Sequence, residues 1–348
     1  MRYGILDYLT ESSVERGVLG PGAEIECFEC RAGWELPDRV GALDAVMVWH
    51  LLQVDADVVR RLRVCRVIVR VGAGYDNVDL AAAGAAGIPV VTIPDYGTND
   101  VADHAMALLL ALCRRLPVYL DALRLDPVGA WQPEVAGEVS RLTGSTLGII
   151  GLGRIGSAMA VRAKSFGLRV AFYDPYLPDG FEKSLQVERV NSLEELVASS
   201  DYLSIHAPLT AETRGMVNGE LLKRVKPGLT LINVARGGIV SLNAVAEALA
   251  DGRLRAFGAD VLESEPPRPD HPLISAFRAR DPQLDGRILL TPHAAFFATE
   301  SRIEMRTKSA QRMLDAIRGI PLRNCVNSKY LRDARVPILP SPPPPWGP

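Results

Sequence analysis

The chain alternates short apolar runs, rich in β-branched residues, with segments of helical spacing. Runs of this kind predict strands that are buried on both faces of a parallel sheet. They cover residues 64–72, 88–94, 146–153, 168–174, 202–208, 229–235, 255–261 and 287–293. Segments with helical periodicity, such as 157–166 and 241–252, lie between them. Strands that alternate with helices predict an α/β, doubly wound architecture.

Two segments depart from this alternation. Residues 98–124 predict one long helix, whose apolar surface is too broad for a helix that is covered on one side only. We expect this helix to span two lobes or to pack against a partner subunit. Residues 336–348, "VPILPSPPPPWGP", predict an extended or disordered proline-rich tail, with a polyproline ligand for another protein as the alternative.

Length and charge narrow the classes of function. A chain of 348 residues is long for a single core, so two domains are expected. The formal net charge of -2 provides no electrostatic reason to expect nucleic acid or an anionic membrane as partner. The longest strongly apolar run, 105–113, is far below the roughly 18 residues that a membrane span needs. We therefore expect a soluble protein that binds neither.

The five cysteines indicate the redox state of the cellular compartment and whether a metal site is to be expected. An odd count in a large chain, without the features of a signal peptide at its start, favours the reducing cytoplasm. Cys27 and Cys30 form a C-x-x-C, which is compatible with a redox pair or half a metal site. Because no second C-x-x-C or nearby histidine pair completes a ligand set, we expect ordinary thiols and no metal.

A glycine pattern predicts a dinucleotide site. The segment "LGIIGLGRIGSAMA" carries G-x-G-x-x-G at Gly151, Gly153 and Gly156, directly after a predicted strand and at the start of a predicted helix. The first glycine permits a tight turn, the second lets a pyrophosphate approach the backbone, and the third lets helix and strand pack closely. Asp174 ends the next predicted strand, where a carboxylate accepts hydrogen bonds from ribose hydroxyls and repels a 2′-phosphate. The expected cofactor is NAD.

About 100 residues precede this fingerprint. We expect them to build a substrate lobe that is closed by the return of the chain after about residue 295, with the active site in the cleft between the lobes.

Three further segments lie at predicted strand ends: "NVARGGIV" (233–240), "DVLESEPP" (260–267) and "TPHAAF" (291–296). Together they offer one arginine, a choice of acids and one histidine. An arginine can bind a substrate carboxylate with two parallel hydrogen bonds, and a histidine can exchange the hydroxyl proton near neutral pH. A carboxylate that orients the histidine favours its protonated form.

These motifs, in this order, resemble the D-isomer-specific 2-hydroxyacid dehydrogenases over about residues 40–330. "VRVGAGYDNVD", "AKSFGLRVAFYDPYLPDG", "IEMR" and "NCVNSKYL" are most similar to the C-terminal binding protein branch and its bacterial relatives. The resemblance implies two Rossmann-like or flavodoxin-like domains with doubly wound parallel sheets and a deep interdomain cleft. It implies a substrate-binding domain at 1–97 plus 296–335, an NAD-binding domain at 98–295 and the tail at 336–348.

The resemblance also implies roles for individual residues. Arg236 would bind the substrate carboxylate and polarise its carbonyl, His293 would be the acid/base, and Glu265 its partner, while Glu263 is expected to be solvated. The cofactor contacts implied are Gly151, Gly153, Arg154, Ile155, Gly156, Asp174, Ala207, Pro208, Thr213, Val234, Ala235, Asp260 and His293. The substrate contacts implied are Trp49, Arg70, Val71, Gly72, Ala73, Gly74, Arg236 and Phe296. His50, His104, His206 and His271 are the rivals for the acid/base role.

The resulting hypothesis is an NAD-dependent dehydrogenase that acts on a D-2-hydroxy acid or its 2-keto counterpart and forms a homodimer. One alternative keeps the machinery and changes the substrate to a phosphonate or another phosphorus oxyacid, which Arg70 and Arg236 would clamp. A second alternative is an NAD(H)-sensing dimeric scaffold that resembles the corepressors of the C-terminal binding protein branch.

Overall fold

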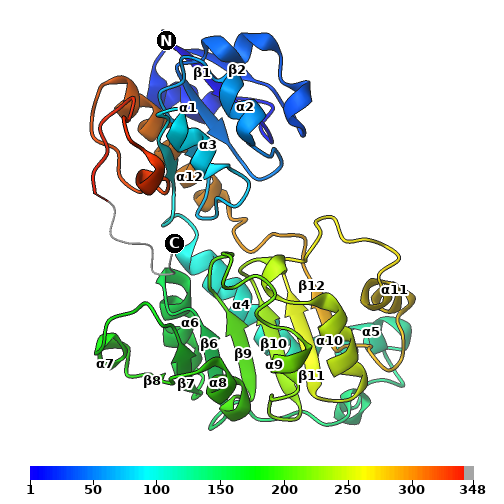
Figure 1. Cartoon of the computed structure of the whole chain (residues 1–348). Coiled ribbons are helices and arrows are strands. Elements are labelled where there is room, and N and C mark those ends of the chain that lie inside the picture. The colour runs from blue at the N-terminus through cyan, green and yellow to red at the C-terminus, as the bar shows by residue number, and fades with distance from the viewer. Residues whose placement is uncertain (341–348) are drawn as a thin grey trace. The chain divides into compact units, whose positions relative to one another are not determined.

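The computed structural model describes residues 1–340, which form two compact units (Figure 1). Unit 1 consists of residues 1–97 and the described residues from 297 onward, and unit 2 consists of residues 98–296. Each unit is built on one parallel sheet with helices along it. The predicted α/β fold with doubly wound parallel sheets is therefore confirmed.

The sheet of unit 1 has the strand order β2-β1-β3-β4-β5. Because the chain runs from β1 outward to β2 and then returns to β3 on the other side, the order reverses between β1 and β3. Its strands are β1 (Arg2–Ile5), β2 (Glu24–Cys27), β3 (Ala45–Val48), β4 (Ile68–Arg70) and β5 (Val90–Thr92). Its helices are α1 (Ser13–Leu19), α2 (Ala56–Arg61), α3 (Leu80–Ala85) and α12 (Thr299–Ile317), with the 3-10 turns η1 (Gly33–Glu35), η2 (Asp38–Ala42) and η5 (Ser328–Tyr330).

The sheet of unit 2 has seven strands in the order β12-β11-β10-β9-β6-β7-β8, and its order reverses between β6 and β9. Its strands are β6 (Thr146–Ile150), β7 (Arg169–Tyr173), β8 (Glu188–Arg189), β9 (Tyr202–Ile205), β10 (Leu229–Asn233), β11 (Leu254–Ala259) and β12 (Ile288–Leu290). Its helices are α4 (Thr98–Cys113), α5 (Leu116–Leu125), α6 (Arg154–Ser165), α7 (Phe181–Leu185), α8 (Leu193–Ser199), α9 (Gly219–Leu222), α10 (Leu242–Ala250) and α11 (Pro272–Ala279), with the 3-10 turns η3 (Pro133–Ala136) and η4 (Gly237–Ile239).

Both faces of the unit 2 sheet are covered, which explains the continuous apolar strands in its sequence. One core cluster joins α4 and α6 to strand residues such as Ile149 and Ile232. The other joins α8, α9 and α10 to their strand neighbours, Ile150 and Leu231. Successive strand side chains point to opposite faces, so each strand feeds both clusters. The helices cover the faces of the sheet, and the loops that carry the candidate site follow the carboxyl ends of its strands.

The prediction of a single helix over residues 98–124 is wrong, because the segment forms two helices, α4 and α5. The break falls at Arg115, which has a left-handed backbone with φ of 57°. Pro117 explains the break: proline lacks the N–H of the helical ladder and its ring clashes with the carbonyl four residues earlier. Proline is tolerated in the first turn of a helix, which is where α5 has it.

The start of the predicted tail is paired with the body of unit 1. The amide of Leu339 donates to the carbonyl of Leu322 at 2.8 Å, and that of Leu322 donates to Pro337 at 3.0 Å. The side chain of Val336 is buried. Residues 341–348, the rest of the predicted tail, lie outside the described residues. The strands β1, β2, β3 and β8 were not predicted. Polar residues interrupt β1 and β2, and β8 has only two residues, whereas β3 is continuously apolar and follows the same pattern as the predicted strands.

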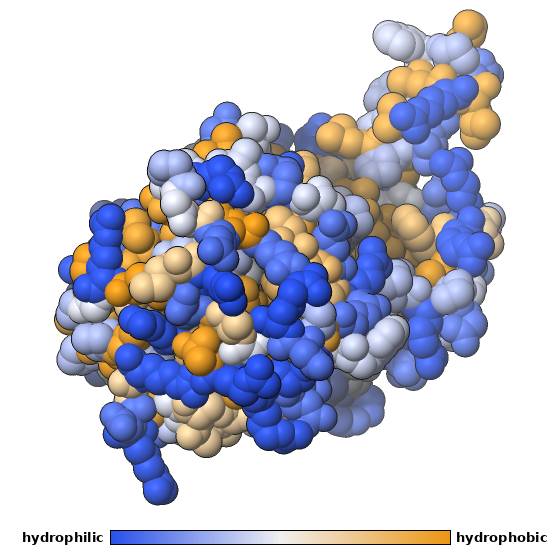
Figure 2. Space-filling model, turned by 90° about the horizontal axis from the view of Figure 1, so that it is seen from above, coloured by the Kyte–Doolittle hydropathy of each residue, from blue (hydrophilic) through white to orange (hydrophobic). Residues whose placement is uncertain are grey.

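All five cysteines are free. Burial raises the pKa of Cys27 to about 11 and also raises that of Cys30, so the C-x-x-C pair lacks the thiolate character of a redox site. Within residues 1–340 no helix is long and apolar enough to cross a membrane. The face seen in Figure 2 is largely hydrophilic, with hydrophobic residues scattered over it. The cytoplasmic location stays a prediction.

Candidate active site

The turn between β6 and α6 has the geometry of a dinucleotide-binding loop. Gly151 has φ of 87°, and a Cβ on it would lie 2.8 Å from the amide nitrogen of Ala207. A Cβ on Gly156 would lie 2.1 Å from the carbonyl oxygen of Gly151, so helix and strand require glycine at both positions. A Cβ on Gly153, by contrast, would have no neighbour within 4 Å. This open position, next to the N-terminus of a twelve-residue helix, fits a pyrophosphate group.

The other predicted cofactor contacts flank this turn. Asp174 is buried directly after β7 and accepts the amide of Leu152 at 3.0 Å, which ties it to the glycine turn. Burial raises its pKa, although hydrogen bonds from the amides of Tyr176 and Leu152 oppose this. In the loop after β9, the Thr213 hydroxyl donates to the carbonyl of Pro208 at 2.6 Å. Ala207 and Val234 are buried, Ala235 and Ile155 partly buried, and Arg154 exposed.

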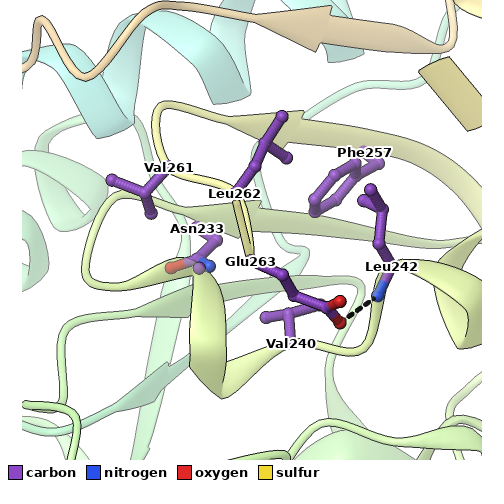
Figure 3. Close-up of a pocket in the computed structure, with 8 residues that line it drawn as sticks. Asn233, Val240, Leu242, Phe257, Val261, Leu262 and Glu263 are labelled. Atoms are coloured by element: carbon purple, nitrogen blue, oxygen red, sulfur yellow. Dashed lines mark hydrogen bonds between the residues drawn. The ribbon is translucent and has the colours of Figure 1, made fainter. Parts of the chain in front are cut away.

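The loops after β10 and β11 touch backbone to backbone. Gly237 lies so near the second loop that a Cβ on it would be 1.9 Å from the carbonyl carbon of Leu262. Arg236 directly precedes this contact, and its Nη1 donates to the carbonyl of Ala235 at 2.8 Å. Figure 3 shows the side chains of Asn233, Val240, Phe257, Val261 and Leu262 in the pocket between these loops. The pocket is too tight to hold a water molecule, so it is part of the packing that holds the two loops together.

Glu263, expected to be a solvated bystander, has a structural contact. Its Oε1 accepts the amide of Leu242 at 2.8 Å, as the dashed line in Figure 3 shows. Leu242 is the first residue of α10, whose unpaired N–H groups attract an acceptor and a negative charge. The side chain therefore fastens the loop after β11 to the N-terminus of α10. Nothing in the local sequence signals this contact, because the partners are 21 residues apart.

Glu265 and His293 form a pair within unit 2. The Nδ1 of His293 and the Oε2 of Glu265 are 2.7 Å apart, and the other carboxylate oxygen accepts the amide of Leu262 at 3.1 Å. Burial raises the pKa of Glu265. This effect is outweighed by the hydrogen bond and charge of His293, by the hydrogen bond from the Leu262 amide and by the charge of Arg236, so the pKa of Glu265 lies below its usual value. Glu265 is therefore an ionised carboxylate that holds the imidazole. The aromatic ring of Phe296 lies edge-on to His293, with 6.0 Å between the centroids.

Asp260 organises the loop that carries His293. Its Oδ1 accepts the Thr291 hydroxyl at 2.5 Å and the Ala294 amide at 2.8 Å, and its Oδ2 accepts the Ala295 amide at 2.9 Å. The Nε2 of His104 lies 2.9 Å from the Thr291 hydroxyl. Because that hydroxyl gives its proton to Asp260, His104 donates to it. Asp260 and His104 thus brace the turn at His293, which has φ of 53°. The contact that the resemblance implies between Asp260 and the nicotinamide stays a prediction.

The predicted substrate residues outside unit 2 lie at the carboxyl ends of β3 and β4 in unit 1. Arg70 is buried, and its guanidinium donates to Asn77 Oδ1 at 3.2 Å and to the carbonyl of Val71. Trp49 is buried directly after β3. The segment from Val71 to Gly74 follows β4, and Gly72 has φ of 120°. A Cβ on Gly72 would lie 2.6 Å from Nη1 of Arg70.

The rival histidines have other surroundings. Desolvation lowers the pKa of His206 to about 3, and its Nε2 is 2.9 Å from the Ser204 hydroxyl, so it is neutral near pH 7. His271 accepts the amide of Leu273 at 3.2 Å and caps α11. His104 is engaged with Thr291, as described above. His50 lies beside Tyr8, with 5.2 Å between the ring centroids. His293, in contrast, is paired with an ionised glutamate.

A doubly wound sheet with this glycine turn, and a paired histidine and glutamate at its carboxyl edge, is typical of dinucleotide-binding proteins. The family is then given by comparison with known proteins. Residues 106–295 match the NAD binding domain of the D-isomer specific 2-hydroxyacid dehydrogenases. The chain belongs to that family.

Named relatives agree with this assignment. The chain is 35% identical over 306 residues to a D-3-phosphoglycerate dehydrogenase of Archaeoglobus fulgidus, covering 88% of this chain and 55% of the relative. It is 34% identical to one of Methanocaldococcus jannaschii, covering 93% and 59%. The chain thus spans less than two thirds of the length of both. A protein of Thermus thermophilus of known crystal structure is 33% identical, with a TM-score of 0.81 and coverage of 92% of this chain and 97% of that one.

Proposed function

We propose that this protein is an NAD-dependent dehydrogenase that interconverts a D-2-hydroxy acid and its 2-keto acid. The observation that carries the proposal is the 2.7 Å contact between His293 and Glu265, in the unit that also holds the dinucleotide turn. General acid/base catalysis needs an imidazole that can exchange a proton near neutral pH and a group that orients it. The ionised Glu265 meets the second requirement.

In the proposed mechanism, His293 moves the hydroxyl proton. Bound NAD supplies the acceptor or donor of the hydride. Because Glu265 engages Nδ1, we assign the proton exchange with the substrate to Nε2. In the direction of reduction, protonated His293 gives its proton to the carbonyl oxygen; in oxidation, the neutral ring takes it back. The contact with Glu265 fixes the orientation of the ring during both directions of transfer.

Arg236 is proposed to bind the substrate carboxylate and to polarise the carbonyl. A guanidinium forms two parallel hydrogen bonds with a carboxylate, which fixes the orientation of a 2-keto acid as well as binding it. Gly237 supports the assignment, because the backbone contact that it permits holds the Arg236 loop against the loop that carries Glu265. The relatives named D-3-phosphoglycerate dehydrogenase support a 2-hydroxy acid as the substrate class.

The test is NADH oxidation against a panel of 2-keto acids, 2-oxo phosphonates and phosphite, with the variant His293→Asn. His271→Asn is a matched control, because asparagine retains the acceptor that caps α11. We expect turnover of 2-keto acids, a loss of about 100-fold or more in His293→Asn, and normal rates in His271→Asn. Normal turnover in His293→Asn would show that the acid/base assignment is wrong.

We further propose that the chain is related to the C-terminal binding protein branch of the family. This relation favours a protein whose dimerisation responds to NAD(H), either as an enzyme or as a scaffold. Both versions would change their mass with NADH in light scattering. They differ in turnover, because a scaffold would turn over none of the acids. The intact pair of His293 and Glu265 is compatible with both versions.

We further propose a homodimer that forms through α5 and the segment after it. All residues of α5 are at least partly exposed in the single chain. Leu125, Val128 and Trp131 are 82%, 85% and 79% exposed, and Leu116 and Leu120 are about half exposed. Such a run of large apolar side chains is typical of a surface that is covered by a partner. A second copy of the chain offers the same apolar surface, which suits an isologous contact.

Light scattering of Leu120→Glu tests the dimer. Val161→Glu is a matched control, since Val161 on α6 is 54% exposed and Leu120 51% exposed. We expect the mass of a dimer in the control and of a monomer in Leu120→Glu, because a buried unpaired carboxylate opposes association. Equal masses for both variants would exclude α5 as the interface.

A further inference from the structure

A side-chain hydrogen bond in unit 2 joins two loops that the strand order keeps apart. The hydroxyl of Tyr176 donates to a carboxylate oxygen of Glu212. Tyr176 lies in the loop after β7, and Glu212 lies in the loop after β9. In the sheet, β6 separates β7 from β9. Since neighbouring strands lie about 4.8 Å apart, the two strands are about 10 Å apart, and the bond crosses the carboxyl edge of the sheet beyond β6.

The dinucleotide turn follows β6 and lies between the same two loops. On one side, a Cβ on Gly151 would be 2.8 Å from the amide nitrogen of Ala207, in the loop after β9. On the other side, Asp174 accepts the amide of Leu152 at 3.0 Å. The strand order reverses between β6 and β9, which is where ligands of open α/β sheets bind. The bond from Tyr176 thus completes a ring of contacts around the place where the adenosine half of NAD is expected.

The loop after β7 is held by contacts of its own. The guanidinium of Arg189, on β8, donates to three carbonyl groups of this loop. The acceptors are Asp174 at 3.2 Å, Leu177 at 3.3 Å and Pro178 at 2.9 Å. The amide of Tyr176 donates to the Asp174 carboxylate at 3.1 Å, and the side chain of Tyr176 packs against the core cluster that contains Leu231. The position of Tyr176 therefore does not depend on Glu212.

The loop after β9 is held around Thr213, which is buried. The Thr213 hydroxyl donates to the carbonyl of Pro208 at 2.6 Å and accepts the amide of Thr210 at 2.8 Å. The amide of Thr213 in turn donates to the Thr210 hydroxyl at 3.3 Å. Glu212, the neighbour of Thr213, is exposed. Because both loops are fixed, the part that can move is the Glu212 side chain, by rotation into solvent.

We propose that Tyr176 and Glu212 form a gate that controls the rate at which NAD enters and leaves the dinucleotide site. The gate is closed while the hydrogen bond is formed and open while Glu212 is rotated away. Both partners belong to the protein and lie on fixed loops, so the gate closes equally well with and without the cofactor. Entry and release are then slowed by the same factor, and the affinity for NAD is unchanged. The proposal goes beyond the dehydrogenase function, because it concerns exchange of the cofactor with any substrate.

The strength of the bond sets the size of the effect. A hydrogen bond between protein groups typically shifts an equilibrium by about 2- to 12-fold, so we expect the closed state to be favoured by about fivefold. If only the open state exchanges NAD, loss of the bond should raise both the association and the dissociation rate constant by about fivefold.

The first experiment measures NADH association and dissociation by stopped-flow fluorescence, with the full chain and no substrate. Tyr176→Phe keeps the ring that packs against the core and removes the hydroxyl. Tyr119→Phe is the matched control, because the Tyr119 hydroxyl also donates to a protein oxygen, the carbonyl of Pro133 at 2.9 Å. We expect both rate constants to rise about fivefold in Tyr176→Phe, with Kd within about twofold of the wild type, and no change in the control.

Three results would overturn the gate. Rate constants in Tyr176→Phe that equal those of the wild type would mean that the bond blocks nothing. Faster dissociation at an unchanged association rate would make Tyr176 an ordinary binding contact. Absence of NADH binding to the wild-type chain would remove the site itself. Normal gating without turnover of any 2-keto acid would leave this inference standing and overturn the proposed function.

A double-mutant cycle tests whether the two side chains act together. Glu212→Ala should raise both rate constants about as much as Tyr176→Phe, and the double variant should be no faster than either single variant, because the same bond is lost in all three. Glu220→Ala is the control, since Glu220 is also exposed and pairs with Lys223. Effects that multiply in the double variant would show that Tyr176 and Glu212 act independently and would contradict the gate.

Discussion

A single methyl group at Gly237 should separate the two loops that carry the proposed catalytic residues. In Gly237→Ala, the new Cβ would lie 1.9 Å from the carbonyl carbon of Leu262, 2.0 Å from its oxygen and 2.5 Å from the amide nitrogen of Glu263. These atoms are backbone and cannot rotate away. Since carbon atoms pack at about 3.5 Å or more, the two loops must move apart by roughly 1.6 Å.

The size of the effect follows from that displacement. Overpacking of a close contact costs typically about 1–3 kcal/mol, and we expect the upper end because two backbone segments are involved. We also expect a large loss of catalytic rate. Arg236 precedes Gly237 directly, and Glu265 is three residues beyond Leu262, so the movement separates the substrate-binding group from the group that orients His293. Misplacement by about 1 Å can cost about 100-fold in rate.

The assay combines urea unfolding with the kcat/KM of NADH-dependent reduction. Gly238→Ala is the matched control, because its Cβ would approach only the ends of two flexible side chains, Leu209 at 3.2 Å and Arg214 at 3.5 Å. We expect Gly237→Ala to lose about 3 kcal/mol of unfolding free energy and about 100-fold in kcat/KM, and Gly238→Ala to lose much less of both. If the two variants were equally stable and equally active, the argument that Gly237 positions the site would be refuted.

Three other substitutions test separate contacts. Glu265→Gln removes the carboxylate that holds Nδ1 of His293, so kcat/KM for reduction should fall by about tenfold or more; an unchanged kcat/KM would contradict the orienting role of Glu265. Asp174→Asn retains an acceptor for the Leu152 amide and removes the charge that repels a 2′-phosphate; the ratio of kcat/KM for NADH over NADPH should fall about tenfold, and a constant ratio would argue against a ribose contact. Glu263→Ala should lower the unfolding free energy by about 1 kcal/mol and Glu263→Gln by less; wild-type stability in Glu263→Ala would mean that the contact with Leu242 contributes nothing.

The dinucleotide turn could be predicted from sequence because its determinants are local. Gly151, Gly153 and Gly156 lie within one strand–turn–helix segment. Gly151 and Gly156 meet backbone requirements that no other residue meets, and Gly153 leaves open space for a pyrophosphate. The core strands were predictable for a related reason: burial on both faces makes them continuously apolar. The helix break at Arg115 also has a local cause, Pro117. The apolar periodicity of residues 98–124 nevertheless led to the prediction of one continuous helix.

The supports of the candidate site could not be predicted in this way. Asp260 reaches Thr291 and the amides that follow it 31 to 35 residues later, and His104 reaches Thr291 across 187 residues. Glu263 is exposed, as expected, but its contact with the N-terminus of α10 exists only because the tertiary structure places α10 beside it. These contacts depend on which strands are neighbours, and the apolar pattern does not specify strand order.

The sequence by itself determined the fold class, the dinucleotide turn and the residue types available for acid/base work, since each depends on backbone sterics or on burial over a few residues. The family resemblance implied that Glu265 meets His293, and only the tertiary structure decided which acid of residues 260–267 braces its loop and which one contacts the N-terminus of α10. The tertiary structure also brought Tyr176 to Glu212 across the carboxyl edge of the unit 2 sheet. Hydrogen bonds and ring contacts act over a few ångströms, so they exist only once distant segments have been brought together by the packing of both sheets.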